Sequence, residues 1–160
     1  MLNVKGTVNV SRKKISRQVT IATDVAGSGA YADGDAVGHP FVLENVVREV
    51  GLGGEIVSCV MIDQNDQGIA CDVILFSSPF VPTTDNAAFT PSDADLVYGL
   101  GHFSISSFSN FNSNQIGTAR GIGLGFVLPE GSSIYGQLVA RGAPTYGTSL
   151  VRLLFTIEQD

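Results

Sequence analysis

The sequence predicts an all-β protein, an antiparallel β-sandwich, and favours an eight-stranded jelly roll with an extended N-terminal arm. Three observations favour this class. Val, Ile, Thr, Phe and Ser are abundant and no long helix-forming stretch occurs, as is typical of β-proteins. Turn signals recur every 8–14 residues, which is the spacing of sandwiches and barrels. The length of 160 residues suits one domain with a sizeable core.

A basic N-terminal arm is predicted over residues 1–17, followed by a single β-sandwich domain over residues 18–160. Residues 1–23 carry five basic residues and no acidic one, whereas residues 24–160 carry four basic and fifteen acidic residues. A basic segment on an acidic body indicates contact with a negatively charged partner. The candidate contact residues are Lys5, Arg12, Lys13, Lys14 and Arg17.

The arm has alternative interpretations. It can simply add solubility, or residues 3–10, which alternate apolar and polar, can form an edge strand that pairs with a neighbouring subunit. Binding to nucleic acid is not expected, because the five charges lack interleaved aromatic residues. Deletion of residues 1–17 is expected to leave the protein folded, with its subunits still assembled, but to weaken its attachment to the partner.

Eight strands are expected after the arm, each a β-branched or apolar stretch bounded by turn residues. They cover residues 18–22, 36–43, 55–63, 69–77, 97–106, 118–128, 133–141 and 150–158. Pro40 places the second of them at a sheet edge or a bulge. The run 73–76 is the most apolar of the chain, as is typical of a strand buried on both faces.

A β-hairpin formed by residues 55–63 and 69–77, with a polar turn at 64–68, is predicted to lie at the centre of the core. In that register Cys59 and Cys71 face each other across the two strands. A disulfide between them is possible, but two buried free thiols are favoured in a reducing compartment.

The long polar loop 83–95 contains a helix-start signal. Thr90 as N-cap, Pro91 at the first helical position and Asp93 at the third predict a single helical turn over 91–95. Asp85, Thr90 and Asp93 are therefore expected to order this loop. The alternative, in which Asp85, Asp93 and Asp95 hold a cation, is less favoured.

Two further sets of residues are candidates for an interface with another subunit or with a partner protein. Phe108 and Phe111 are aromatic residues in a polar loop, where exposure usually marks an interaction site. Gly121, Gly123 and Gly125 occupy alternate positions of one strand, so its open face lets another backbone approach. The low charged content of 15% also favours a packed interface, although a surface rich in Ser, Thr and Asn gives the same composition.

No motif for catalysis, a cofactor or a metal is present. The two histidines, His39 and His102, lack the spacing of a metal site, and no Gly-x-Ser-x-Gly elbow occurs. Residues 63–68 resemble the start of an EF-hand loop, but its twelfth position is Ile74 instead of Glu. The sequence therefore predicts a protein that is not an enzyme and needs no cofactor or small-molecule ligand. No signal-peptide or membrane-length apolar run is found, so synthesis in a cytoplasm is expected.

Four segments together resemble a known family. They are Tyr31-Ala-Asp-Gly-Asp-Ala-Val-Gly38, Gly51-Leu-Gly-Gly-Glu-Ile-Val-Ser58, Leu75-Phe-Ser-Ser-Pro79 and Asp85-Asn-Ala-Ala-Phe89. In this order and spacing they are similar to segments of small tailed-phage virion proteins, the auxiliary capsid proteins that decorate and cement the capsid lattice. The resemblance spans about residues 30–105.

The resemblance implies a jelly-roll protein that forms a homotrimer, binds the major capsid protein and resides on the virion surface. The alternative function is a carbohydrate- or receptor-binding module of a phage fibre or tail. It requires exposed aromatic residues around a shallow site, for which Tyr31, Phe108, Phe111 and Tyr146 are the candidates.

Overall fold

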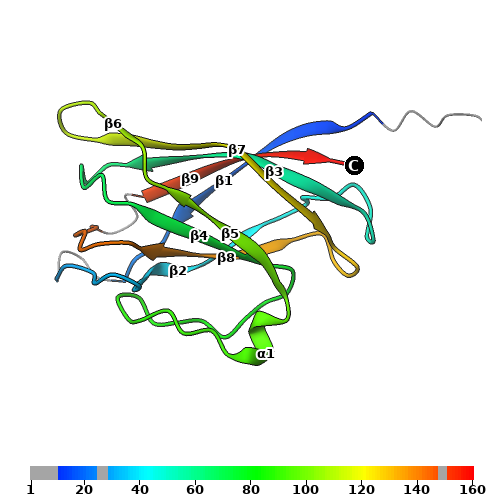
Figure 1. The fold of residues 1–160 in the computed structure, drawn as a ribbon, viewed down its shortest axis with the longest axis horizontal. Helices are drawn as coiled ribbons and strands as arrows, with labels where there is room; N and C mark the ends of the chain where they lie inside the picture. The colour runs from blue at the N-terminus through cyan, green and yellow to red at the C-terminus, as the bar shows by residue number, and fades with distance from the viewer. Residues whose placement is uncertain (1–10, 25–28, 148–150) are drawn as a thin grey trace, which may run out of the picture.

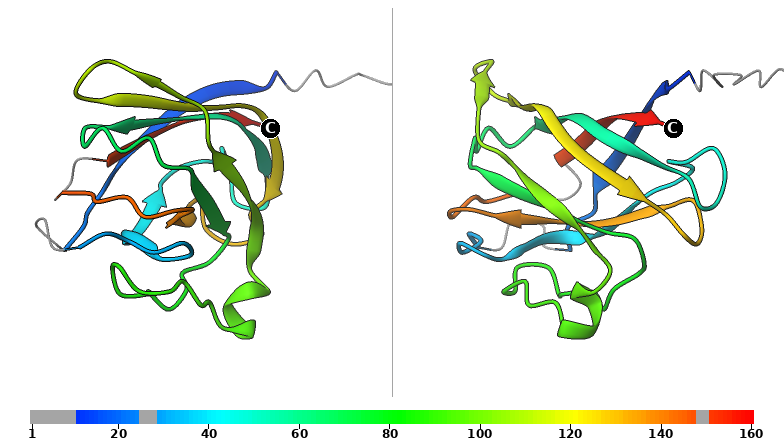
Figure 2. Two further views of the ribbon diagram at one scale, coloured as in Figure 1. Left: turned by 60° about the vertical axis from the view of Figure 1, so that its left-hand side comes forward. Right: turned by 45° about the vertical axis from the view of Figure 1, so that its right-hand side comes forward.

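The computed structural model describes residues 11–24, 29–147 and 151–160. These residues form nine strands and one helical turn, packed as two antiparallel sheets (Figures 1 and 2). The elements are β1 (Lys13–Ile21), β2 (Ala36–Leu43), β3 (Gly53–Asp63), β4 (Cys71–Phe76), α1 (Asp93–Leu96), β5 (Gly99–Ile105), β6 (Phe108–Asn110), β7 (Gln115–Val127), β8 (Ile134–Ala140) and β9 (Val151–Gln159). The predicted β-sandwich is confirmed.

The strand order is that of a jelly roll with one added strand. One sheet has the order β1-β9-β3-β7-β6 and the other the order β2-β8-β4-β5. Strands far apart in the sequence are neighbours, because β1 pairs with β9, β2 with β8, β3 with β7 and β4 with β5. A long antiparallel hairpin that is rolled up into two sheets produces these pairs. The added strand β6 extends the five-stranded sheet beyond β7.

Alternating side chains fill the space between the two sheets. In β9, Val151, Leu153, Phe155 and Ile157 are fully buried, while the residues between them point to the opposite face. The ring of Phe155 contacts Phe41 of β2 and Phe103 of β5, both from the four-stranded sheet. The core therefore lies between the sheets.

The predicted central hairpin is wrong. β3 belongs to the five-stranded sheet and β4 to the four-stranded sheet, so the two strands do not pair. The loop between them is ordered by Asp63, whose carboxylate accepts hydrogen bonds from the backbone N–H groups of Asn65, Gln67 and Gly68. A loop ordered in this way can connect strands of two different sheets as well as the two strands of a hairpin.

β4 nevertheless lies at a centre of the core, between β8 and β5. Its inward residues Val73 and Leu75 are fully buried between the sheets. On its outward side, Phe76 is covered by the long connection 77–98, in which Phe80 stacks at 4.4 Å from it. The prediction of a strand covered on both faces is therefore correct for this end of β4. Figure 2 shows this connection and α1 as a layer outside the four-stranded sheet.

β2 is the edge strand that Pro40 predicts. It lies at the end of the four-stranded sheet, and its register with β8 shifts between Val37 and Phe41. Gln137 of β8 is buried and donates from Nε2 to the carbonyl oxygens of Val37 and Gly38, both at 3.1 Å. The interrupted part of the ladder thus has its carbonyl groups satisfied.

Cys59 and Cys71 are free and buried, in different sheets, so the cross-strand register predicted for them is wrong. Burial raises the pKa of both thiols, that of Cys71 to about 12. We expect a reducing agent to leave the melting temperature unchanged. Maleimide at pH 8 should label neither thiol in the native protein and both in urea, because thiolates are scarce and inaccessible until unfolding. A lower melting temperature with reductant would show that the two residues are bonded.

Candidate interaction surfaces

The predicted arm boundary at residues 17 and 18 is wrong, because β1 begins at Lys13 and pairs with β9 over its whole length. Removal of residues 1–17 would delete more than half of this strand, which has nine residues, so that truncation is no longer expected to leave the fold intact. Lys5 lies outside the described residues. Lys13 and Lys14 are exposed on β1 and make no ion pair within the described part of the chain.

The two arginines of the predicted arm have partners within the chain. Arg12 is 3.3 Å from the Asp160 carboxylate and 3.8 Å from that of Glu55. Arg17 donates to the carbonyl oxygens of Glu44 and Asn45, at 2.6 and 2.8 Å. Arg17 thereby fastens the segment after β2 against the sheet edge, and its guanidinium is not available as a free contact.

The solvent face of the five-stranded sheet carries the glycine row. Gly121, Gly123 and Gly125 are exposed on β7, while Ile122 and Leu124 between them pack toward the core. A Cβ atom at Gly121 would meet nothing within 4 Å, and at Gly125 it would meet only a backbone oxygen at 4.0 Å. This part of the sheet is therefore open to another molecule.

The same face carries basic side chains without partners. Lys14 of β1, Arg152 of β9 and Arg120 of β7 all point outward and are exposed. No ion pair or hydrogen bond of these three side chains occurs among the described residues. Arg12 and Asp160 lie beside Glu55 at one end of the face, so with Glu158 the face has four basic and three acidic residues, in a chain with nine basic and fifteen acidic residues. We did not predict Arg120 and Arg152 from the sequence, although both occupy outward positions of the strand alternation.

The two phenylalanines of the predicted polar loop have different environments. The segment is not a loop but the β6–β7 hairpin, in which Phe108 pairs with Gly117. The Phe108 ring packs over this glycine, where a Cβ atom would come within 2.6 Å of it. Phe111 lies at the hairpin tip and its side chain is 56% exposed. Of the two, only Phe111 is free to contact a partner.

Three of the four aromatic residues proposed for a sugar-binding site do not lie around a shallow surface site. Tyr31 and Tyr146 are buried against each other with ring centroids 5.9 Å apart. Burial raises the pKa of both phenols. Tyr31, Tyr146 and the partly covered Phe108 therefore cannot present a stacking surface to a sugar. Of the four candidates, Phe111 remains exposed.

Asp85 joins two of the four segments that carry the family resemblance. Its buried carboxylate accepts hydrogen bonds from the Tyr31 hydroxyl at 2.8 Å, the Gly38 N–H at 2.7 Å and the Asp24 N–H at 2.8 Å. Backbone hydrogen bonds also join the two segments, among them Ala36 N–H to the Ala87 carbonyl at 2.8 Å. The segments 31–38 and 85–89 thus fold together, and the motif orders the loops in this structure.

The predicted helical turn is present, but it begins later in the chain than predicted, and a different residue caps it. Ser92, not Thr90, is the N-cap of α1, accepting a hydrogen bond from the Asp95 N–H and donating one to the Asp95 carboxylate. Thr90 and Asp93 are exposed. No group of three or more metal-ligating side chains is found in residues 11–24, 29–147 and 151–160. None of their helices is long and apolar enough to cross a membrane.

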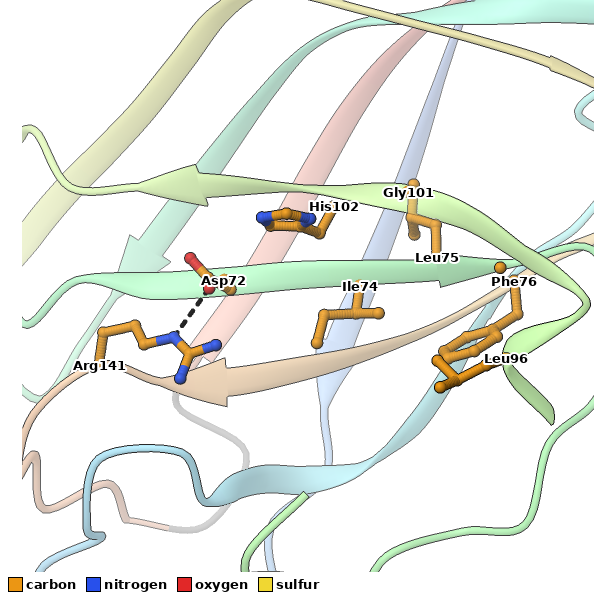
Figure 3. A pocket seen from close by; sticks show the side chains of 9 residues that line it. Asp72, Ile74, Leu75, Phe76, Leu96, Gly101, His102 and Arg141 are labelled. Carbon is orange, nitrogen blue, oxygen red and sulfur yellow. Dashed lines mark hydrogen bonds and ion pairs between the residues drawn. The ribbon is translucent and has the colours of Figure 1, made fainter. Parts of the chain in front are cut away.

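A groove of about 330 Å³ lies on the outer side of β4 and β5 (Figure 3). One end is polar, where Arg141 donates to Asp72 at 2.8 Å and His102 projects beside them from β5. Burial acts to raise the pKa of Asp72. Hydrogen bonds from Ser104 and Arg141, together with the nearby charges of Arg141 and His102, outweigh burial and lower this pKa below its usual range. The other end is apolar and is lined by Ile74, Phe76 and Leu96.

No protein-family model matches the chain, and no curated protein matches it. Among solved structures, the chain is similar to one from Desmodium yellow mottle tymovirus, with 16% identity, 99% of this chain and 89% of that chain covered, and a TM-score of 0.26. This TM-score is too low to support an argument, so the assignment of the fold rests on the strand order.

Proposed function

We propose that this protein is a structural component of a virion, a homotrimer that decorates and cements the capsid lattice of a tailed phage by binding its major capsid protein. The role is non-enzymatic and the site of action is the capsid surface. The family resemblance supports this proposal, and two of its segments meet at the Asp85 carboxylate. A jelly roll with ordered loops is a suitable rigid unit for repeated lattice contacts.

The observation that carries the proposal is the solvent face of the five-stranded sheet. It combines an open glycine row with the cations Lys14, Arg120 and Arg152, which have no partner among the described residues. The layer on the opposite side of the sandwich, residues 77–98, contains three aspartates and no basic residue. This separation of charge supports an orientation with the five-stranded sheet toward a negatively charged capsid surface and the acidic layer toward solvent.

Modest affinity at each contact is sufficient for such a role. Three copies in a trimer bind neighbouring lattice positions, so the second and third contacts form at a high effective concentration. Each contact depends on exposed charges, which salt screens over about 8–10 Å at physiological ionic strength. Attachment is therefore expected to weaken as salt is raised.

Co-sedimentation with purified capsids that lack this protein tests the proposal. Arg120→Glu and Arg152→Glu are each expected to weaken binding by about tenfold, because a like charge then faces the acidic partner. Arg48→Glu is the control, since it makes the same charge change at an exposed position outside this face, with the loss of one hydrogen bond to the Ser11 carbonyl. Equal losses in all three variants, or no loss in any, would contradict the assigned face. Wild-type protein that fails to sediment with capsids would contradict the function.

The second candidate, a glycan- or receptor-binding module, now depends on Phe111 as the one exposed member of its proposed aromatic set. A glycan array with the wild-type protein distinguishes it from the capsid role. Specific glycan binding without capsid binding would replace the cement proposal.

A further inference from the structure

A cleft rich in hydroxyl groups lies where β4 ends, beside the turn between β7 and β8 (Figure 1). It consists of two adjoining hollows of about 400 and 200 Å³, which share Ser77, Ser78 and Glu130 in their walls. We call it the hydroxyl cleft. None of its lining residues belongs to the groove over β4 and β5. The larger hollow has a volume typical of a small-ligand site.

Hydrogen bonds hold the backbone around the hydroxyl cleft in place. The N–H and the hydroxyl of Ser77 both donate to the Tyr98 carbonyl, at 2.8 and 3.2 Å, and so join the two ends of the connection 77–98. The Val46 N–H donates to the Ser132 carbonyl at 2.8 Å, which fastens the turn between β7 and β8. A ligand therefore meets a site that is already formed, and binding costs little ordering of the backbone.

The side chains of the wall, in contrast, are unoccupied. Six of its polar side chains form no hydrogen bond or ion pair with the described residues, and they are those of Ser78, Tyr98, Glu130, Ser132, Ser133 and Tyr135. In the free protein such groups bind water, which a ligand with matching donors and acceptors replaces. Several convergent polar groups in one concave site are the usual means of orienting a small ligand.

The composition of the wall restricts the chemistry of this ligand. No Lys, Arg or His lies among the described residues that line it, and Glu130 is their one carboxylate, so phosphates, nucleic acids and acidic peptides are disfavoured. One carboxylate is also too few to hold a metal ion. A lipid or an apolar peptide would leave the serine hydroxyls and Glu130 without water and without partners. The wall therefore favours a neutral ligand with many hydroxyl groups.

A saccharide has this chemistry. Neighbouring sugar hydroxyls can donate to both oxygens of the Glu130 carboxylate in charge-assisted hydrogen bonds. Serine hydroxyls donate or accept as each sugar oxygen requires. The C–H face of a sugar ring is apolar and packs on an aromatic ring. Tyr98, which is 49% exposed, lines the smaller hollow, and Tyr135 lines the larger one.

We propose that the hydroxyl cleft binds a neutral saccharide, with Glu130 as the main acceptor for its hydroxyl groups and Tyr98 as the stacking ring. The inference goes beyond the proposed function and does not depend on it. It also uses none of the aromatic residues considered for the receptor-binding alternative. In the orientation proposed for capsid binding, the layer 77–98 faces solvent, so the cleft stays accessible. Many copies on one particle then raise the avidity of a weak single site.

Saturation-transfer difference NMR on the full-length protein tests the inference. The probes are glucose, galactose, mannose and N-acetylglucosamine with their linear trimers, and sialic acid and a neutral glycine-serine tetrapeptide serve as comparisons. At least one neutral saccharide is expected to receive saturation. Its affinity should fall about tenfold in Glu130→Gln, which loses the charged acceptor, and about tenfold in Tyr98→Ala, which loses the ring.

Two matched controls make the same chemical changes outside the cleft. Glu49→Gln neutralises an exposed carboxylate, and Phe111→Ala removes an aromatic side chain that is 56% exposed. Both should keep the affinity of the wild-type protein. Glu130→Gln and Tyr98→Ala should retain the wild-type circular dichroism and should co-sediment with capsids as the wild-type protein does, so failure of this inference is distinguishable from failure of the proposed function.

The outcomes separate the possible ligands. If the wild-type protein also binds an insoluble polysaccharide of the same sugar and Tyr98→Ala does not, a surface polymer is supported as the source of the ligand, whereas binding of the trimer alone supports a free oligosaccharide. Absence of saturation in every neutral saccharide at millimolar concentration, or a preference for sialic acid or the peptide, would overturn the inference. So would affinity that persists in both cleft variants, or that is lost in Phe111→Ala instead.

Discussion

Replacement of Phe155 by alanine is expected to lower the free energy of unfolding by about 3–5 kcal/mol. The side chain is fully buried on β9 and its ring packs against Phe41 at 5.7 Å and Phe103 at 6.3 Å. These three rings come from both sheets, so the deletion leaves a cavity where the sheets meet. Because Phe41 and Phe103 are held by their own strands, the cavity cannot close by a local shift.

Equilibrium unfolding in urea at fixed protein concentration measures this loss. Phe155→Leu keeps most of the apolar volume and is expected to cost less than half as much. Val81→Ala, at an exposed position, should change the free energy of unfolding by no more than about 0.5 kcal/mol. A Phe155→Ala variant as stable as Val81→Ala would show that the two sheets are not held together at this point.

The positions of most strands could be predicted because strand formation leaves a local signal. The alternation in β9 places Val151, Leu153 and Phe155 on one face, and the structure buries all three. Pro40 gave the edge position of β2 for an equally local reason, since proline cannot donate to the ladder. In each case the deciding interaction involves residues close together in the chain.

The pairing of strands could not be predicted in the same way. The two-residue period of a strand indicates which face is buried, but it carries no information on which strand lies alongside. The loop from Asp63 to Gly68 has the composition of a hairpin turn, and Asp63 orders it locally, yet it carries the chain from one sheet to the other. In a jelly roll most partners are distant in sequence, so local reasoning favours the wrong neighbour.

The same limit applies to the candidate surfaces. Arg17 belongs to a basic cluster in sequence, but the carbonyl groups of Glu44 and Asn45 that occupy it are about 27 positions away. Tyr31 and Tyr146 are residues of the type that stacks on sugars, but in the structure their rings pack against each other and are buried. Exposure of an aromatic or basic side chain depends on its long-range neighbours, so Phe111 and Arg120 could be distinguished from Phe108 and Arg17 only in three dimensions.

Replacement of Asp85 by alanine is expected to lower the free energy of unfolding by at least about 3 kcal/mol. Three donors, the Tyr31 hydroxyl and the N–H groups of Gly38 and Asp24, lose their shared acceptor. Asp85 is only 6% exposed, so water does not replace the carboxylate without rearrangement of the loops. Hydrogen bonds to a charged acceptor are each worth about 1.5–3 kcal/mol, which is why the loss exceeds that of a typical polar residue.

Two further substitutions test whether the loss of stability in Asp85→Ala comes from its hydrogen bonds or only from the removal of a carboxylate. Tyr31→Phe removes one donor and should cost about 1 kcal/mol, and in the Asp85→Ala background it should cost less, because the hydroxyl no longer has its partner. Asp93→Ala removes an exposed carboxylate from the same long connection and should cost less than about 1 kcal/mol. Urea unfolding at neutral pH measures all four proteins. If Asp85→Ala proves no less stable than Asp93→Ala, the segments 31–38 and 85–89 are held by their backbone hydrogen bonds alone, and the carboxylate at the meeting point of the family-like motifs has some task other than holding the loops.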